Sequence, residues 1–197
     1  MRNLKIKFGF FSIFIILALL FTSNKFTFLS FLAATIHEVG HLVASKIFKI
    51  RICELNFGLL GARLKTSGFL CSYKQEILLC FFGPLFNFLS AAVLYIISKN
   101  MGDLCKEIDF FIMSSLVLGI LNLLPIRTFD GGRILESILS CFLPIEKVFF
   151  IINLFSFIII FSLWCISVYF LLIYTSSLGL FIFSLSLFAS LFIEDNA

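Results

Sequence analysis

The sequence has little charge, three prolines and only two histidines. Charged residues make up 13% of its 197 residues and hydrophobic residues 61%, and the mean hydropathy is +1.14. Because soluble domains carry roughly 25% charged residues, this composition excludes a water-soluble globular protein. It also excludes a disordered chain, since apolar segments do not stay solvated. The lipid bilayer is therefore the expected solvent.

The six cysteines form no C-x-x-C pair, which argues against a disulfide scaffold. Most of them lie in apolar runs, where a thiol packs as a small hydrophobic side chain. The net charge of +4 does not indicate a nucleic-acid partner, because the charged residues mark the ends of apolar segments. None occurs between residues 148 and 193.

Charged residues divide the chain into six segments near the length of about 20 apolar residues that a helix needs to cross a bilayer. We therefore expect an all-α, polytopic membrane protein with one domain over residues 1–197. Residues 49–74 contain scattered glycines and are expected to form a short membrane-associated hairpin. The expected spans are 8–21, 26–48, 75–98, 110–126, 148–172 and 176–193.

The first span is short and follows a basic tail, as in a signal peptide, but no A-x-A type cleavage pattern follows it, so it is expected to be retained. The last two spans are expected to turn near Thr175, Ser176 and Ser177. The basic residues predict a multi-pass protein of the cell membrane with both termini in the cytoplasm. This topology leaves only Lys25, Lys99 and Lys106 of the fifteen basic residues outside.

The second segment contains the motif H-E-x-x-H, formed by both histidines of the chain, His37 and His41, with Glu38 beside the first. Residues four apart share one face of a helix, so both imidazoles can reach one ion while Glu38 lies next to it. The pattern predicts a zinc site with its own general base. A buried polar pair joining helices and a proton relay are the alternatives.

A catalytic zinc site needs a third protein ligand, which here must be a carboxylate or a thiolate. The acidic residues in or beside the loop 49–74, on the opposite side of the membrane and in the tail are set aside, which leaves Asp130, Glu136 and Glu146. Asp130 is favoured because it follows Pro125 and precedes two glycines, so its backbone can leave the helix and approach another element. The alternative is an ordinary turn, or an N-cap for the segment that starts at Arg133.

Three motifs in this order resemble the sporulation branch of the site-2 proteases, intramembrane zinc metalloproteases typified by stage IV sporulation protein FB. The second and third follow the pattern G-P-x-x-N in the third span and N-x-x-P…D-G around the fourth. The resemblance covers residues 1 to about 140. The residues that carry it are His37, Glu38, His41, Gly83, Pro84, Asn87, Asn122, Pro125, Asp130 and Gly131.

The resemblance implies that Asp130 is the third zinc ligand and that Asn87, Asn122, Gly83 and Pro84 line the active site. Hydrogen bonding between helices is the alternative for the two asparagines. The family resemblance also implies a membrane-tethered protein substrate that the loop 49–74 receives, such as a sporulation transcription-factor precursor. It further implies a membrane regulator or inhibitor. The chain is expected to lack the C-terminal regulatory domain of many relatives.

In this interpretation Glu38 takes a proton from the attacking water and delivers it to the leaving amine. The motif lies five to nine residues before Lys46, or about 8 to 14 Å from the cytoplasmic end of the span at 1.5 Å per residue. Cleavage is therefore expected near the cytoplasmic leaflet. The alternative functions are a metal or ion carrier, an inactive binding protein, and another membrane zinc hydrolase such as a prenyl-protein protease.

Overall fold

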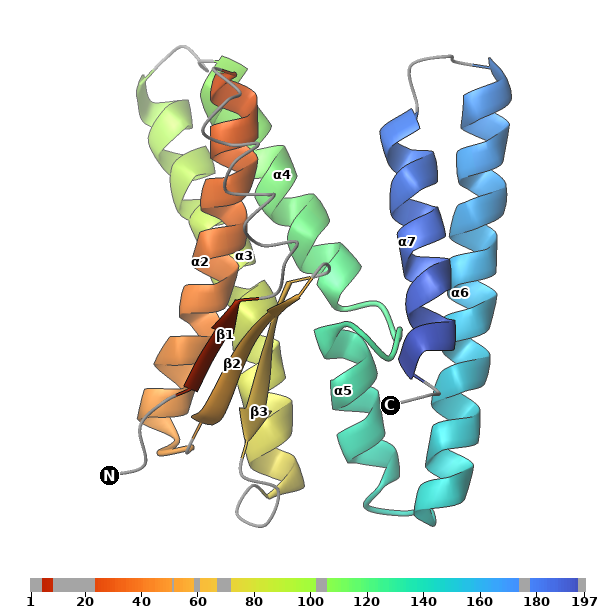
Figure 1. The fold of residues 1–197 in the computed structure, drawn as a ribbon. Helices are drawn as coiled ribbons and strands as arrows, with labels where there is room; N and C mark the ends of the chain where they lie inside the picture. Colours follow the sequence, from red (N-terminus) through yellow and green to blue (C-terminus); the bar gives the residue numbers. More distant parts are fainter. Residues whose placement is uncertain are drawn as a thin grey trace. The chain divides into compact units, whose positions relative to one another are not determined.

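The computed structural model describes residues 5–8, 24–50, 52–58, 61–66, 72–101, 106–173 and 178–194. The chain divides into two compact units, Met1–Leu123 and Leu124–Ala197. The first unit contains a three-stranded sheet and helices α2, α3 and α4, and the second contains α5, α6 and α7 (Figure 1). The elements are β1 (Lys5–Phe8), α2 (Lys25–Ile47), β2 (Ile52–Gly58), β3 (Gly61–Thr66), α3 (Tyr73–Met101), α4 (Lys106–Asn122), α5 (Asp130–Leu139), α6 (Ile145–Ile173) and α7 (Leu178–Glu194).

Helix α2 begins and ends with local hydrogen bonds that its sequence provides. The side chain of Asn24 caps the first turn by accepting from the Phe26 amide at 3.1 Å, as is typical of asparagine at this position. At the other end Lys49 takes a positive φ of 53°, and the Ile50 amide donates to the Ser45 carbonyl at 2.8 Å. This is the Schellman arrangement that satisfies the last carbonyls of a helix.

Helices α2, α3 and α4 pack against one another through small residues. The buried face of α2 comprises Ala33, His37, Gly40, His41, Ala44 and Ser45. A Cβ atom added to Gly40 would meet the carbonyl of Phe82 on α3, so only glycine allows the two backbones this approach. Such small residues are typical of packed membrane helices, where the lipid supplies no hydrophobic driving force between helices.

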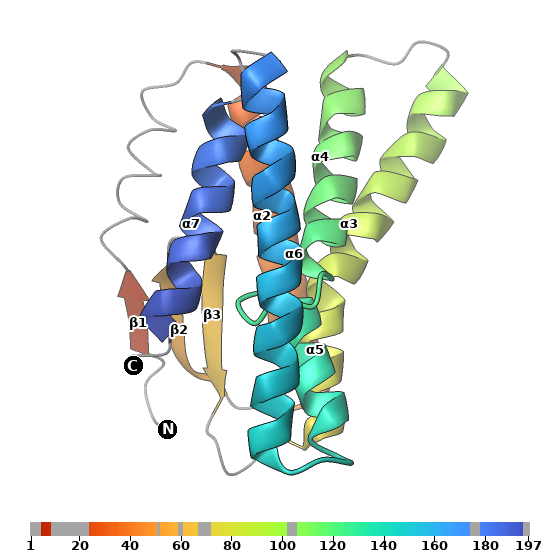
Figure 2. The ribbon, with the colours of Figure 1, turned by 90° about the vertical axis from the view of Figure 1, so that its right-hand side faces the viewer.

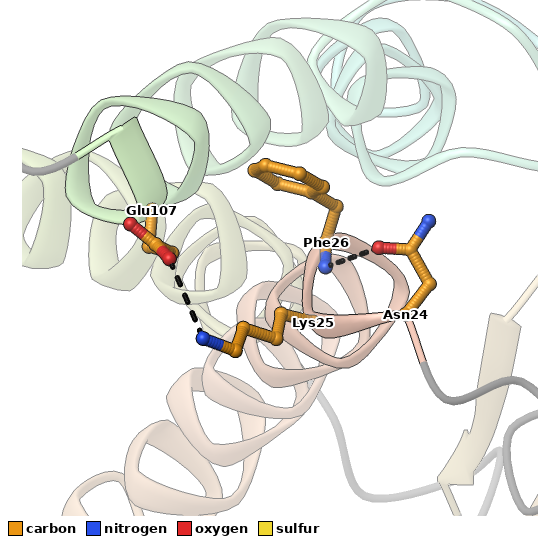
Figure 3. Close-up of polar contacts among 4 residues, drawn as sticks. All are labelled: Asn24, Lys25, Phe26 and Glu107. Atoms are coloured by element: carbon orange, nitrogen blue, oxygen red, sulfur yellow. Dashed lines mark hydrogen bonds and ion pairs between the residues drawn. The ribbon is translucent and has the colours of Figure 1, made fainter.

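The starts of α2 and α4 lie together. The Lys25 ammonium is 3.7 Å from the Glu107 carboxylate (Figure 3), and the rings of Phe26 and Phe110 are 4.8 Å apart in an edge-on arrangement. The ion pair is exposed and therefore adds little to the stability of the fold, but it shows that the first turns of α2 and α4 are neighbours. Helices α2 and α4 therefore run in the same direction. Helix α3, which lies between them in the sequence, runs antiparallel to both.

The strands form one sheet in the order β1-β2-β3. β2 and β3 are antiparallel, with Leu55 opposite Leu64, and β1 pairs with β2 in parallel, with Lys5 opposite Glu54. The hairpin expected within residues 49–74 is confirmed by β2 and β3. The additional strand β1 was not predicted, because its four residues belong to the basic tail, and an alternation as short as Lys5-Ile6-Lys7-Phe8 does not by itself mark a strand.

In the second unit, α6 and α7 lie side by side in both ribbon views (Figures 1 and 2). The hydroxyls of Ser167 and Ser184 are 2.9 Å apart and buried between them, while Phe157 and Phe188 pack at 6.2 Å. The contacts pair the start of one helix with the end of the other, so α6 and α7 form an antiparallel hairpin. Their turn, 174–177, falls outside the described residues.

The protein is a mainly helical, polytopic membrane protein, as the sequence predicts. By length and composition three of the described helices can cross a membrane, Lys25–Ile47, Tyr73–Lys99 and Ile145–Ile173. Helices α4 and α7 have 17 residues each, or about 26 Å at 1.5 Å per residue. The expected span 8–21 falls outside the described residues except for Phe8, which ends β1. The expected span 110–126 starts at Lys106 and ends at Asn122, before Pro125.

Candidate metal centre

The two histidines of the chain point at each other from consecutive turns of α2. Their Nε2 atoms are 3.2 Å apart, and the rings meet at 85° with centroids separated by 4.8 Å. Each side chain is 5% exposed, so the pair is buried. The helical spacing thus brings both nitrogens to one point, as the motif predicts.

A backbone group of α3 fixes the protonation of His41. Its Nδ1 lies 2.8 Å from the carbonyl oxygen of Leu79, and a carbonyl can only accept, so the proton is on Nδ1. In the neutral ring Nε2 then carries a lone pair and can bind a metal ion. Such outer hydrogen bonds commonly orient metal-binding histidines.

The ring of His37 also has a partner on α3. Its Nδ1 is 3.3 Å from the amide nitrogen of Asn87. Asn87 is 0% exposed, and its Oδ1 is buried with no hydrogen-bond partner among the described residues. The structure therefore brings Asn87, which the sequence singles out, against the first histidine of the motif.

Gly83 and Pro84 both lie on α3, and Gly83 is next to the two imidazoles. A Cβ atom at Gly83 would be 2.5 Å from Nε2 of His41 and 2.8 Å from Nε2 of His37. The missing side chain thus leaves space at the two nitrogens that would hold an ion. Pro84, buried within α3, is tolerated in a membrane helix where neighbouring groups compensate.

Two further residues that the sequence predicts for the site, Glu38 and Asn122, lie on α2 and at the end of α4. Glu38 follows His37 on α2 and is half-buried. Asn122 ends α4, is half-buried, and donates from Nδ2 to the Leu118 carbonyl of its own helix at 3.0 Å. This bond is local to α4 and does not bring Asn122 to the histidines.

Asp130 is buried in the second unit, 8% exposed, as the first residue of α5. It is not the N-cap of a segment starting at Arg133, since Phe129 occupies the cap position. The helix starts earlier because the chain folds back on its first turn: a Cβ atom at Gly132 would meet the carbonyl of Ile126. Gly132 therefore allows the backbone of the first turn of α5 to lie close to the backbone of Ile126.

The loop before Asp130 is anchored to α6. The Arg127 amide donates to the Ser156 hydroxyl at 2.9 Å, and its guanidinium reaches Asn153 Oδ1 at 3.4 Å. The guanidinium also lies 5.4 Å from the centre of the Phe149 ring. These contacts hold the loop that precedes Asp130. No motif in the sequence predicts them.

The donor set suits zinc. The two buried imidazoles of the first unit supply two nitrogen ligands, and two imidazoles with one carboxylate are a catalytic zinc set. The two features that fit the metal are the Nε2 lone pair of His41 and the space above Gly83.

The fold and the paired histidines define a polytopic membrane protein with a candidate metal centre. Residues 98–163 match the model of Peptidase family M50. A zinc metalloprotease of Methanocaldococcus jannaschii is 30% identical over 118 residues, which are 57% of this chain and 33% of the relative. The chain thus spans about a third of the length of that curated relative.

The fold is that of a solved site-2 protease, also from Methanocaldococcus jannaschii. The TM-score is 0.67 at 24% identity, covering 97% of this chain and 90% of the other. Similarity to Peptidase family M50 and to the zinc metalloprotease therefore covers part of the chain, and the solved site-2 protease shows the likeness of fold. The match to residues 98–163 includes Asn122 and Asp130 and lies outside the H-E-x-x-H motif.

Proposed function

We propose that this protein is an intramembrane zinc metalloprotease that hydrolyses a peptide bond of a membrane-tethered protein. The observation that carries the proposal is the pair of buried Nε2 atoms 3.2 Å apart on α2. Burying two imidazoles in a membrane protein costs free energy, so such residues are retained mainly where they serve a function. The supported M50 family and the named zinc metalloprotease relative agree with this chemistry.

In this proposal zinc is held by His37, His41 and Asp130. The support from the second unit is that Asp130 is buried at the start of a helix whose preceding loop is anchored. The motif D-G after N-x-x-P, which the sequence shares with the sporulation branch of the site-2 proteases, supports the same residue.

When bound, zinc lowers the pKa of a water ligand to about 7 and polarises the scissile carbonyl. The protein's own residues do the rest. Glu38, beside the first ligand, takes a proton from the attacking water and delivers it to the leaving amine nitrogen. The Leu79 carbonyl keeps the proton of His41 on Nδ1, and Gly83 leaves room for the reacting atoms. Asn122 contributes to the lining of the site.

We further propose that the cut lies near the cytoplasmic leaflet and that both termini are cytoplasmic. The ion pair between Lys25 and Glu107 supports this, because it brings together the two helix ends that the basic residues assign to the outer side. The motif is in the later half of α2, toward Lys46 and the opposite end.

The substrate would be received by the sheet. Among the described strands β3 pairs only with β2, so it has an edge to which an extended peptide can add by backbone hydrogen bonds. A substrate helix must unwind before its carbonyls can be attacked, and strand addition would hold it unwound. A sporulation transcription-factor precursor, and a membrane regulator or inhibitor, are the partners that the motif resemblance suggests.

The test is cleavage of membrane-tethered reporters by the full-length chain in lipid vesicles. We expect a cut peptide bond in the cytoplasmic half of the reporter span, located by mass spectrometry, and loss of cleavage in His41→Ala. Chelation should stop cleavage and added zinc should restore it. Transport of metal across the vesicle membrane without any cleavage would instead identify an ion carrier and refute the proposal.

A further inference from the structure

An apolar groove lies in the first unit, on the half of the helix bundle that is remote from Lys46. Its volume is about 530 Å³, and side chains of α2, α3 and α4 line it. Helix α2 contributes one face of residues 29–36, α3 contributes one face of residues 86–94, and α4 contributes its first two turns. The groove therefore runs along the helices, beside the metal centre but outside it.

The lining of the groove is polar at one end only. Apart from Ser90, which donates to the Asn87 carbonyl of its own helix at 2.9 Å, the polar side chain in the lining is Glu107. Its carboxylate pairs with the Lys25 ammonium at 3.7 Å, and the Lys25 side chain is 81% exposed (Figure 3). The groove thus combines a long apolar body with one exposed end that carries a positive and a negative charge.

The dimensions of the groove distinguish a lipid chain from a helix as its occupant. Residues 86–94 extend about 12 Å at 1.5 Å per residue, close to the ~15 Å of one leaflet. Over this length the volume of about 530 Å³ corresponds to a mean cross-section of about 45 Å². A helix with its side chains is 10–12 Å across and needs about 80–110 Å². The groove is therefore too narrow for a substrate helix, and it fits an extended hydrocarbon chain.

We propose that the groove binds one acyl chain of a zwitterionic phospholipid, with the headgroup at Lys25 and Glu107. The phosphate and the ammonium of phosphatidylethanolamine complement the two opposite charges of this ion pair. The lipid belongs to the leaflet in which α2 begins, because the charged end of the groove lies at the start of that helix.

The physical basis of binding is packing and charge. Lipid tails are as apolar as the lining, so the hydrophobic effect does not favour the groove over the bilayer. A chain between three helices makes more van der Waals contacts than one beside a single helix, and a lysine near the membrane surface attracts phosphate. A ligand that binds only the folded state also stabilises it. None of these contributions requires a metal ion, so the inference is independent of the proposed function.

The experiment titrates the full-length chain in detergent with dioleoyl phosphatidylethanolamine and counts the bound lipid by native mass spectrometry. Val93→Trp fills the groove with a large side chain. Val117→Trp is its matched control, because the two valines are 52% and 48% exposed and Val117 lies outside the lining. Lys25→Gln removes the charge at the headgroup, and Lys46→Gln removes the same charge from the last turn of α2.

We expect one tightly bound lipid per wild-type chain and affinity weaker by about 10-fold or more in Val93→Trp, because the indole overpacks the groove. Lys25→Gln should bind about fivefold more weakly, the effect of one basic side chain at a lipid headgroup. Val117→Trp and Lys46→Gln should match the wild type. Added lipid should raise the unfolding temperature of the wild type and leave that of Val93→Trp unchanged.

Equal lipid binding by Val93→Trp and Val117→Trp, both with wild-type helical circular dichroism, would identify only the general lipid layer around the protein and overturn the inference. If Val93→Trp does not fold, wild-type binding by Lys25→Gln overturns it. Displacement of the lipid by the span of a tethered reporter would assign the groove to substrate and overturn it too. Absence of zinc or of cleavage would instead refute the proposed function and leave lipid binding unchanged.

Discussion

His41 donates from Nδ1 to the carbonyl oxygen of Leu79 over 2.8 Å, from α2 to α3. Because the acceptor is a backbone group, the orientation of this imidazole depends on where α3 lies and not on the side chain at position 79. Displacing α3 by a fraction of an ångström would therefore misdirect the Nε2 lone pair. The residues that set the distance between the two helices are expected to control metal binding.

Replacing Gly83 by alanine should disrupt the metal centre. The added Cβ would lie 2.5 Å from both Cε1 and Nε2 of His41, so either the ring or α3 must move. Crowding of this kind in a packed region costs about 1 to 3 kcal/mol, which corresponds to an affinity loss of roughly 5- to 150-fold. Zinc titration of Gly83→Ala measures it.

Gly179→Ala is the matched control, since a Cβ atom there meets nothing within 4 Å. It should bind zinc like the wild type, and helix propensity should make it no less stable. Equal zinc affinity of Gly83→Ala and Gly179→Ala would show that the space beside the histidines is irrelevant to the metal.

Replacing Glu38 by glutamine should separate catalysis from metal binding. Glutamine has the same shape but cannot accept the proton of water, so cleavage of a tethered reporter should fall by about 100-fold or more. Zinc content should remain that of the wild type, because Glu38 is not among the ligands. Full cleavage by Glu38→Gln would end its role as the base.

Replacing Asp130 by asparagine should weaken both zinc binding and cleavage, because an amide is a poorer zinc ligand than a carboxylate. Glu146→Gln is the control: Glu146 is an exposed acid in the first turn of α6 and loses the same charge. The two variants are compared by zinc competition and reporter cleavage. A loss of similar size in both would attribute the effect to general charge.

Replacing Ser156 by alanine should loosen the loop that leads to Asp130. The Arg127 amide would lose its acceptor, and an unsatisfied buried N–H costs about 1 to 3 kcal/mol. Hydrogen exchange of the 124–129 amides should accelerate and zinc affinity should fall. Ser162→Ala, which removes only a bond to Ile158 of the same helix, should change neither.

The amino-acid sequence predicts the helical elements of the described region well, because apolar length and charged ends determine membrane helices. It places α2 within one residue at each end. It misses the ends of α4 because the apolar run continues past Asn122 toward Pro125, and the helix stops before the proline. It misses β1 because strand pairing with β2 is a contact between distant segments.

The sequence also predicts the histidine pair, since a spacing of four on a helix fixes the geometry. The hydrogen bond from His41 to the Leu79 carbonyl could not be predicted, because every residue has a carbonyl and only packing selects one. Gly40 gives a partial signal as a small residue inside the motif. The anchoring of Arg127 by Ser156 depends on the way the loop folds back and leaves no pattern in the sequence.

The most direct test of the central claim is the zinc content of the purified full-length chain, determined by elemental analysis alongside His37→Ala. The account predicts one zinc ion per wild-type chain, removable by a chelator and restored by added zinc, and none in the variant. A folded wild-type chain that takes up no stoichiometric zinc, or a variant that retains it, would contradict the account.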